Sequence, residues 1–279
     1  MKGKPVADAI TIRAKEEAER LKQNGVYPKL KIVRVGERED DLAYERAAVK
    51  RMETCGILCE VLTLPLDIIH ESFIKELKAV DEDKTVHGIL LFRPLPKQIN
   101  ENEVKFIISP EKDIDCLNPI NVAKVLEGDK SGFPPCTPSA AMEILKYYNV
   151  NLKGSNAVVL GRSMVVGKPM AMLLLKENAT VTICHSKTNN LPNICKKADI
   201  LVAAIGKSNM ISEDFVKDGA VVIDVGINID DGNITGDVKT QECLNKVSLI
   251  TPVPAGVGSV TTAVLAEHVI KSCKQINNK

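Results

Sequence analysis

Four short apolar segments in the second half of the chain constrain its fold most strongly. They cover residues 156–160, 180–184, 200–204 and 221–224, with helix-forming sequence between them. Short, nearly continuous apolar strands that alternate with helices are typical of a parallel sheet covered on both faces. The sequence therefore predicts a doubly wound α/β domain of the kind that binds nucleotides.

The first half of the chain repeats this alternation of helix and strand. Residues 7–23 carry apolar side chains at helical spacing, and a later helix is expected to end near Gly56. Strands are expected over residues 30–35, 59–64 and 88–92. Repeated strand–helix–strand units predict a second parallel sheet, and hence a second α/β domain.

A proline-rich stretch, residues 133–138 (FPPCTP), marks the junction between the two domains. Thr137 is expected to cap a helix that Pro138 opens. The last helix, residues 261–274, is expected to return to the first domain. The predicted domains are residues 1–135 with 252–279, and residues 136–251.

Charge and composition exclude several classes of protein. The 279 residues include 37 basic and 36 acidic side chains, so no net field attracts nucleic acid or a membrane surface. No apolar run reaches the length of a membrane span, and charges such as Lys15 and Glu16 rule out a signal peptide. The eight cysteines and four histidines lack metal-ligand spacing. We expect a cytoplasmic protein with reduced thiols and no metal.

A loop over residues 161–167 (GRSMVVG) follows the first strand of the second domain and precedes a helix opened by Pro169. Gly161 and Gly167 would let the backbone approach a pyrophosphate at the helix N-terminus. A tight turn alone would also need glycine, and the loop lacks the common GxGxxG pattern. Its place among four strands in the correct order favours a dinucleotide site.

The end of the second strand indicates which dinucleotide is bound. NAD-binding domains usually carry an acid there, which accepts from the ribose hydroxyls. Residues 185–188 (HSKT) contain no acid. Ser186, Lys187 and Arg162 suit a 2′-phosphate instead, since they offer hydrogen bonds and positive charge. The sequence therefore predicts NADP as cofactor; the alternative is a polar surface turn.

Four runs together resemble the methylenetetrahydrofolate dehydrogenase/cyclohydrolase family. They are residues 36–51 (GEREDDLAYERAAVKR), 161–169 (GRSMVVGKP), 224–228 (DVGIN) and 251–258 (TPVPAGVG). The resemblance extends over nearly the whole chain. It implies an N-terminal α/β folate-site domain and a Rossmann-like NADP-binding domain, with a cleft between them. It also implies a tetrahydrofolate derivative as substrate, a role in one-carbon metabolism, and a homodimer formed through the cofactor domain.

The resemblance also assigns site residues. The cofactor contacts that it implies are Gly161, Arg162, Ser163, Gly167, Ser186, Ile227 and Thr137. Asp115, in the run 110–115 (PEKDID), corresponds to the carboxylate that binds the pterin's amino and ring nitrogens. Tyr44 and Asp115 are the implied catalytic residues. The other implied substrate contacts are Pro96, Gly256 and Thr261.

Two residues of the family pattern are absent. The family places a tyrosine and a lysine four residues apart on one helix; Tyr44 is present, but the lysine position is Ala48. A glutamine that orients this lysine is replaced by Phe92. Because catalytic partners act as a unit, the loss of both predicts a weak or absent cyclohydrolase activity.

The dehydrogenase step does not need those residues. Loss of hydride leaves a cation stabilised by the adjacent nitrogens, so it requires positioning rather than a general base. The cyclohydrolase step adds water and moves protons, which calls for an acid/base group. Arg51 shares a helical face with Ala48 but stays protonated, Lys50 points away, and Gln98 lies beyond the turn.

Several alternatives remain open. The enzyme could be bifunctional, with Arg51, Gln98 or water replacing the lysine, or Ala48 and Phe92 could be packing residues in a site that binds folate differently. It could act on a related one-carbon carrier, or be a non-catalytic folate or nucleotide binding protein. Cys116 is interpreted as a packed thiol rather than a nucleophile.

The loop over residues 251–261 departs from the family's pattern at Ala255, Ser259 and Val260. Gly256 and Gly258 allow a close approach of the backbone to a ligand. Ala255 fits the loop only if its φ angle is negative.

Overall fold

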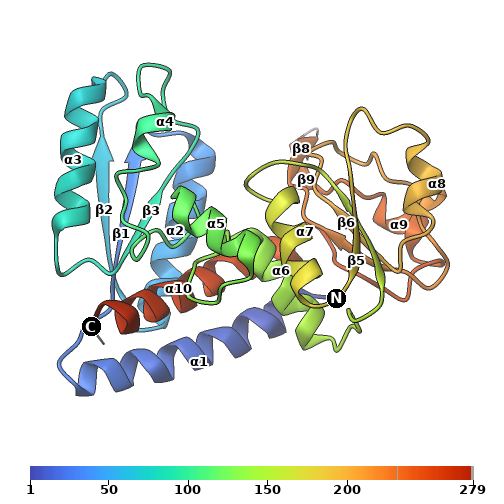
Figure 1. Cartoon of the computed structure of the whole chain (residues 1–279), viewed down its shortest axis with the longest axis horizontal. Coiled ribbons are helices and arrows are strands. Elements are labelled where there is room, and N and C mark those ends of the chain that lie inside the picture. Colours follow the sequence, from blue (N-terminus) through green and yellow to red (C-terminus); the bar gives the residue numbers. More distant parts are fainter. Residues whose placement is uncertain (231, 278–279) are drawn as a thin grey trace. The chain divides into compact units, whose positions relative to one another are not determined.

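The computed structural model describes residues 1–230 and 232–277, which divide into two compact units (Figure 1). The central unit comprises Met1–Ala7 and Pro135–Thr261. The N-terminal unit comprises Asp8–Pro134 and the chain from Thr262 onward. The prediction of two α/β domains is confirmed.

The division differs from the predicted one, because residues 1–7 and 252–261 belong to the central unit. Hydrogen bonds between segments far apart in sequence explain the difference. The Gly3 N–H donates to the Ala255 carbonyl at 2.9 Å, and the Tyr148 hydroxyl donates to the Lys2 carbonyl at 2.9 Å. The first residues of the chain thus stabilise the central unit.

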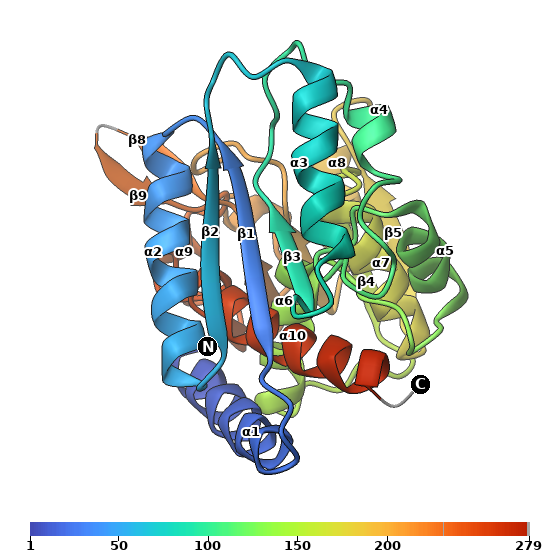
Figure 2. The same ribbon diagram turned by 90° about the vertical axis from the view of Figure 1, so that its left-hand side faces the viewer.

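The N-terminal unit contains a parallel sheet in the order β2-β1-β3 (Figure 2). Its strands are β1 (Lys29–Val35), β2 (Leu58–Leu64) and β3 (Gly88–Leu91), which confirm the three predicted strands. On one face, Val33 and Ile89 pack against Phe73 and Leu77 of α3. Residues that point to the other face, such as Ile32, are also buried.

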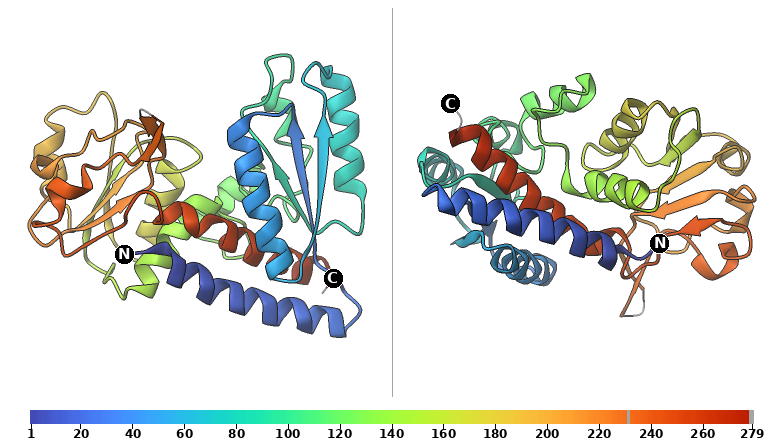
Figure 3. Two further views of the ribbon diagram at one scale, coloured as in Figure 1. Left: turned by 180° about the vertical axis from the view of Figure 1, so that it is seen from behind. Right: turned by 90° about the horizontal axis from the view of Figure 1, so that it is seen from below.

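The helices of this unit include α1 (Gly3–Gln23) beyond its first residues, α2 (Glu39–Thr54), α3 (His70–Glu82), α4 (Glu101–Val104), α5 (Pro119–Glu127) and α10 (Thr261–Asn277). Just past the end of α2, Gly56 has a φ of 69°, as predicted for a glycine at a helix C-terminus. α1 and α10 lie side by side in Figure 3, and the ion pairs Arg13–Glu267 and Lys274–Glu17 join them.

The central unit contains a parallel sheet in the order β10-β7-β6-β4-β5. Its strands are β4 (Asn156–Leu160), β5 (Thr180–Cys184), β6 (Ile200–Ala203), β7 (Val221–Asp224) and β10 (Leu249–Ile250). The first four confirm the predicted strands. The chain enters at β4, adds β5 on one side, and returns to add β6 on the other. The switch point therefore lies between the carboxyl ends of β4 and β6, where doubly wound sheets bind ligands.

Helices α6 (Cys136–Tyr147), α7 (Gly167–Lys176), α8 (Leu191–Cys195) and α9 (Thr240–Cys243), and the 3-10 turns η1 (Glu213–Phe215) and η2 (Val257–Ser259), belong to the central unit. A short antiparallel hairpin, β8 (Asn228–Asp230) and β9 (Asn233–Thr235), follows β7. Within the described residues, no helix is long and apolar enough to cross a membrane.

Candidate functional site

The loop after β4 is built so that only glycine fits at two positions. Gly161 has a φ of 129°, and a Cβ there would lie 2.2 Å from the carbonyl oxygen of Ala204, just past β6. A Cβ on Gly167 would lie 2.2 Å from the Gly161 carbonyl oxygen. The loop thus crosses the switch point in close contact with the protein's own backbone, which requires glycine at both positions, as a tight turn alone would. The approach of this loop to a pyrophosphate stays a prediction.

Ser163 organises the start of α7. Its Oγ accepts hydrogen bonds from the N–H groups of Val166 at 3.1 Å and Gly167 at 3.4 Å. α7 begins at Gly167, two residues before the predicted start at Pro169. Arg162 and Ser163 themselves are exposed, so both can reach a bound ligand.

The turn after β5 lies beside this loop, because Leu160 and Cys184 are register partners at the ends of β4 and β5. The turn is closed by its own hydrogen bonds: the His185 N–H donates to Thr188 Oγ1 and the Thr188 N–H donates to the His185 carbonyl, both at 2.9 Å. Ser186 and Lys187 stay exposed. The structure therefore brings Ser186 to the same edge of the sheet as Arg162.

A cavity of about 260 Å³ lies in the central unit beside Ile227, whose side chain is 66% exposed. Its lining comes from the end of β7 and the segment after it, residues 224–227, from Ile234, and from residues 252–259. Gly256, a predicted substrate contact, lines this cavity. The Thr261 hydroxyl donates to the Gly258 carbonyl at 3.0 Å and holds the loop against the start of α10.

The structure corrects the expectation for Ala255, whose φ is positive at 76°. The loop keeps its shape because the Ala255 carbonyl accepts from Gly3 and the Ser259 hydroxyl donates to the Gly256 carbonyl at 2.7 Å. A Cβ on Gly256 would lie 2.3 Å from the Pro252 carbonyl oxygen, so glycine is required there. At Gly258 the nearest atom would be 3.4 Å away, an ordinary contact.

Two buried aspartates that the sequence did not single out hold the loops around Ile227. Asp237 accepts from the N–H groups of Ile205 at 2.7 Å, Gly206 at 3.0 Å and Lys207 at 2.8 Å, and from the Asn228 amide at 3.0 Å. Its carboxylate therefore joins the loop after β6 to the segment after β7.

Asp224 makes a similar set of contacts with backbone N–H groups. It accepts from the N–H groups of Gly226 and Asp237 at 3.0 Å and of Val238 at 2.9 Å. Burial raises the pKa of the Asp224 carboxyl to about 6, although these hydrogen bonds oppose the change. An acid at the end of a buried apolar strand was the signal in the sequence that could have identified it.

Thr137 does not cap a helix as predicted. α6 begins at Cys136 with Pro135 as the preceding residue, so Thr137 lies inside the first turn. Pro135 supplies a favourable φ of −57°, and the Ser139 hydroxyl donates to the Pro135 carbonyl at 2.9 Å. The helix start therefore depends on Pro135, and the Thr137 side chain is left on the helix surface, partly exposed.

In the N-terminal unit, Tyr44 on α2 faces Phe92 at the end of β3. Their ring centroids are 5.7 Å apart and the ring planes are tilted by 48°. Ala48, one turn after Tyr44, is fully buried, and Phe92 is 7% exposed. Aromatic and methyl groups thus occupy the positions where the family pattern places a lysine and a glutamine.

The residues considered as replacements for the lysine have other contacts. Arg51 Nη1 donates to Thr11 Oγ1 at 2.6 Å and its Nε donates to Thr262 Oγ1 at 3.4 Å. Gln98 Nε2 donates to the Leu66 carbonyl at 2.8 Å. Lys50 is exposed.

Asp113 and Asp115 differ in their surroundings. Asp113 is buried, accepts from the N–H groups of Leu117 and Asn118 at 2.8 Å, and has a pKa raised to about 6 by burial. It therefore orders the chain after β3. Asp115 is partly exposed, and between Asp115 and Leu117 the buried Cys116 adopts a φ of 61°. Burial raises the pKa of the Cys116 thiol to about 12, which supports its interpretation as a packed thiol.

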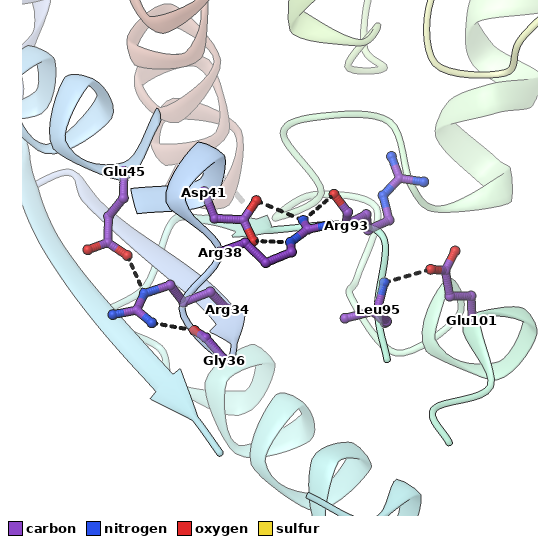
Figure 4. Close-up of polar contacts among 8 residues, drawn as sticks. All are labelled: Arg34, Gly36, Arg38, Asp41, Glu45, Arg93, Leu95 and Glu101. Atoms are coloured by element: carbon purple, nitrogen blue, oxygen red, sulfur yellow. Dashed lines mark hydrogen bonds and ion pairs between the residues drawn. The ribbon is translucent and has the colours of Figure 1, made fainter. Parts of the chain in front are cut away.

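A set of polar contacts joins the start of α2 to the loop after β3 (Figure 4). Arg38 pairs with both carboxylate oxygens of Asp41 at 2.8 Å, and donates to the Arg93 carbonyl at 2.9 Å. Further along the loop, the Leu95 N–H donates to Glu101 Oε1 at 2.9 Å. The backbone next to Pro96, a predicted substrate contact that is partly exposed, is therefore held in place.

No cluster of three or more histidine, cysteine or acidic side chains suited to a metal ion occurs in residues 1–230 and 232–277.

Comparison with known proteins identifies the family. Residues 1–115 match the catalytic domain, and residues 135–277 the NAD(P)-binding domain, of tetrahydrofolate dehydrogenase/cyclohydrolase. The bifunctional protein FolD of Clostridioides difficile is 64% identical, over 100% of this chain and 98% of its own. That of Alkaliphilus oremlandii is 61% identical over the same shares.

Solved structures give the same result. The bifunctional FolD enzyme from Campylobacter jejuni is 40% identical with a TM-score of 0.96, over 98% of both chains. The FolD enzyme from Trypanosoma brucei, solved with NADP and an inhibitor, is 34% identical with a TM-score of 0.95, over 100% of this chain and 98% of its own. The chain therefore belongs to the tetrahydrofolate dehydrogenase/cyclohydrolase family.

Proposed function

We propose that the protein is an NADP-dependent 5,10-methylenetetrahydrofolate dehydrogenase with weak or no cyclohydrolase activity. The dehydrogenase part is supported by the family, whose relatives bear the dehydrogenase name. The observation that supports a weak or absent cyclohydrolase activity is the apolar contact of Phe92 with Tyr44, together with the burial of Ala48.

The cofactor is proposed to bind across the carboxyl ends of β4, β5 and β7. Gly161 and Gly167 admit its pyrophosphate to the N-terminus of α7. Arg162, Ser163 and Ser186 surround the position of a 2′-phosphate, and no acid follows β5 to pair with free ribose hydroxyls. Ile227 and Thr137 are the remaining proposed contacts. The NADP complex of the Trypanosoma brucei relative supports this choice of cofactor.

On the substrate side, Asp115 is proposed to accept from the pterin's amino and ring nitrogens, while Tyr44 lies against the ring system. Pro96, Gly256 and Thr261 are proposed to complete the contacts. The protein then has to hold the one-carbon unit against the nicotinamide and exclude water. Since no proton leaves in the hydride step, no general base is required from these residues.

The hydrolytic step lacks its acid/base group in this proposal. An arginine stays protonated, so Arg51, already bonded to Thr11 and Thr262, cannot cycle protons. Gln98 is bonded to the carbonyls of Leu66 and Ile68. The second candidate is a bifunctional enzyme, and it is favoured by the names of relatives at 64% and 61% identity.

Assaying both steps on the purified protein tests the proposal. NADPH formation from methylenetetrahydrofolate measures the first step, and decay of added methenyltetrahydrofolate, corrected for the spontaneous rate, measures the second. We expect turnover in the first, a preference for NADP over NAD, and little enzymatic decay in the second. Comparable turnover in both steps would establish the bifunctional alternative. Folate binding without NADPH formation would indicate a binding protein.

We further propose that the protein is a cytoplasmic homodimer joined through the central unit. The edge strand β5 exposes Ile183 at 37%, and α7, which precedes β5, exposes Leu175 at 54%. Exposed apolar side chains at a sheet edge suit an interface between identical chains. Sedimentation equilibrium should report a dimer, and Ile183→Lys should weaken it.

A further inference from the structure

Arg93 is the first residue after Phe92, at the carboxyl edge of the sheet in the N-terminal unit. The Phe92 N–H still donates to the Val33 carbonyl at 2.9 Å, so the strand pairing continues to this point. β1 ends at Val35, two residues after Val33, and α2, which carries Tyr44, begins at Glu39. Arg93 therefore lies at the edge where parallel sheets bind their ligands, next to the proposed folate contacts.

The backbone around Arg93 is fixed on both sides. Arg38 is held by Asp41 and donates to the Arg93 carbonyl, and Glu101 accepts from the Leu95 N–H, at 2.9 Å each. In Figure 4 the Arg93 side chain points away from both groups of contacts. Its position is thus set by main-chain contacts, and its guanidinium takes no part in them.

The Arg93 guanidinium differs from the guanidinium groups of the nearby arginines in having no hydrogen-bond or ion-pair partner among the described residues. Arg34 pairs with Glu45 at 2.6 Å, and Arg38 pairs with Asp41 at 2.8 Å. For Arg93, no hydrogen bond or ion pair to the side chain is present in the described part of the chain, although the residue is partly buried. A buried or half-buried guanidinium without a partner costs free energy unless a ligand supplies the acceptors.

The surroundings indicate the chemistry of that ligand. The charge of Arg93 acts on Cys116, whose pKa it lowers against the larger effect of burial, so Arg93 and Asp115 both lie near Cys116. Asp115 can only accept hydrogen bonds when ionised, whereas Arg93 can only donate. Together they complement a ligand that carries N–H donors and acceptor oxygens. A folate has both: the amino and ring N–H groups, and the pterin carbonyl and glutamyl carboxylates.

We propose that Arg93 is a substrate-binding residue that donates to an acceptor oxygen of the bound folate. This inference rests on the proposed function, because it takes the folate site to include Asp115 and Tyr44. The acceptor is either the pterin carbonyl or a glutamyl carboxylate, because oxygen atoms of both can accept hydrogen bonds from a guanidinium.

The test compares Arg93→Leu and Arg93→Lys with the wild type, using the monoglutamate and the triglutamate of methylenetetrahydrofolate at saturating NADP. Arg46→Leu is the matched control, because Arg46 is an exposed arginine on α2. We expect Arg93→Leu to raise the folate KM about tenfold, as for the loss of one charged hydrogen bond. Arg93→Lys should raise it less. The KM for NADP, the thermal unfolding midpoint and the behaviour of Arg46→Leu should not change.

An equal rise for the two substrates assigns an acceptor that both carry, the pterin carbonyl or the first glutamyl residue. A larger rise for the triglutamate assigns the added glutamyl carboxylates, and either result supports the inference. A folate KM within twofold of the wild type for both substrates would overturn it. Calorimetric titration with tetrahydrofolate separates the proposed dehydrogenase activity from the proposed role of Arg93 in substrate binding. Wild-type binding without turnover would reject the dehydrogenase, yet weaker binding by Arg93→Leu would still support the role of Arg93.

Discussion

At the level of single residues, Tyr44 lies near both residues that depart from the family pattern: Phe92, which contacts its ring, and Ala48, one helical turn later. Ala48 is fully buried beneath the turn that carries Tyr44, and the Phe92 ring lies 5.7 Å from the tyrosine ring. A lysine at residue 48 would have to fit its longer side chain and its amine where the Ala48 methyl is now fully buried. Alanine at residue 48 is thus compatible with phenylalanine at residue 92.

We expect Ala48→Lys alone to destabilise the protein by about 2 kcal/mol and to leave hydrolysis unchanged, since the amine is buried against Phe92. Adding Phe92→Gln should supply a partner and raise the rate of methenyltetrahydrofolate decay at least about tenfold, within the range of general acid–base catalysis. Ala47→Lys, on the exposed side of the same helix, is the control and should do neither. Full hydrolytic gain from Ala48→Lys alone would contradict this coupling.

Ala255 gives a second prediction for a single residue. Its φ of 76° lies in the left-handed region, which costs a non-glycine residue roughly 1–2 kcal/mol. Ala255→Gly removes that strain, while the greater freedom of glycine in the unfolded chain returns part of the gain. Urea unfolding should therefore show a stabilisation of up to about 1 kcal/mol. Ala43→Gly, in the exposed interior of α2, should instead lose about 1 kcal/mol. An equal loss of unfolding free energy in Ala255→Gly and Ala43→Gly would show that the backbone at Ala255 is not strained.

At the level of elements, the strands were predictable and the loops that connect them were not. The strands β4 to β7 are short apolar runs between helix-forming segments, a pattern that local sequence reveals. β10, with only Leu249 and Ile250, is too short to give such a signal. Thr137 was misplaced because Pro135, rather than the threonine hydroxyl, starts α6.

Long-range hydrogen bonds explain the remaining differences. Asp237 is 30 to 32 residues from the loop after β6 that it holds, and nothing in its local sequence indicates that distance. Likewise, the positive φ of Ala255 depends on the first helix of the chain, where Gly3 bonds to it. Contacts of this kind become visible only when segments far apart in sequence lie together.

The role of Asp237 predicts a selective defect in the cofactor site. In Asp237→Asn one acceptor oxygen becomes an NH2 group that faces backbone donors, so the loops after β6 and β7 should separate. We expect a loss of about 3 kcal/mol in unfolding free energy and a KM for NADP raised about tenfold or more, with the folate KM less affected. Asp218→Asn, at an exposed position of the same unit, is the control. A defect confined to the folate KM would exclude this role.

At the level of the whole molecule, each unit is completed by one end of the chain. Met1–Ala7 completes the central unit, and the chain from Thr262 completes the N-terminal unit through α10. Within the N-terminal unit, α10 contributes His268, whose ring nitrogen Nδ1 bonds to the Ile114 carbonyl at 2.8 Å, one residue before Asp115. The end of the chain therefore supports the segment that carries the proposed pterin contact.

His268 should make the stability of the N-terminal unit depend on pH in a defined direction. Burial lowers the pKa of His268 from 6.5 to about 4, so the folded state keeps the imidazole neutral where the unfolded chain protonates it. The stabilisation is complete above pH 6.5 and is lost as the pH falls towards 4, by up to about 3 kcal/mol. Asp113 and Asp224, with pKa values raised to about 6, act in the opposite direction over the same range.

Because the opposing contributions of Asp113 and Asp224 overlap with that of His268, the contribution of His268 is isolated by comparison of the wild type with His268→Asn. The asparagine amide can still donate to the Ile114 carbonyl but cannot be protonated in this range. At pH 7 the variant should be less stable, since it loses the edge-on packing of His268 against Phe133 at 5.6 Å between ring centroids. Between pH 6.5 and 4, its unfolding free energy should fall by about 3 kcal/mol less than that of the wild type. Parallel curves for the two proteins in urea titrations across this range would show that His268 is protonated equally in the folded and unfolded chains.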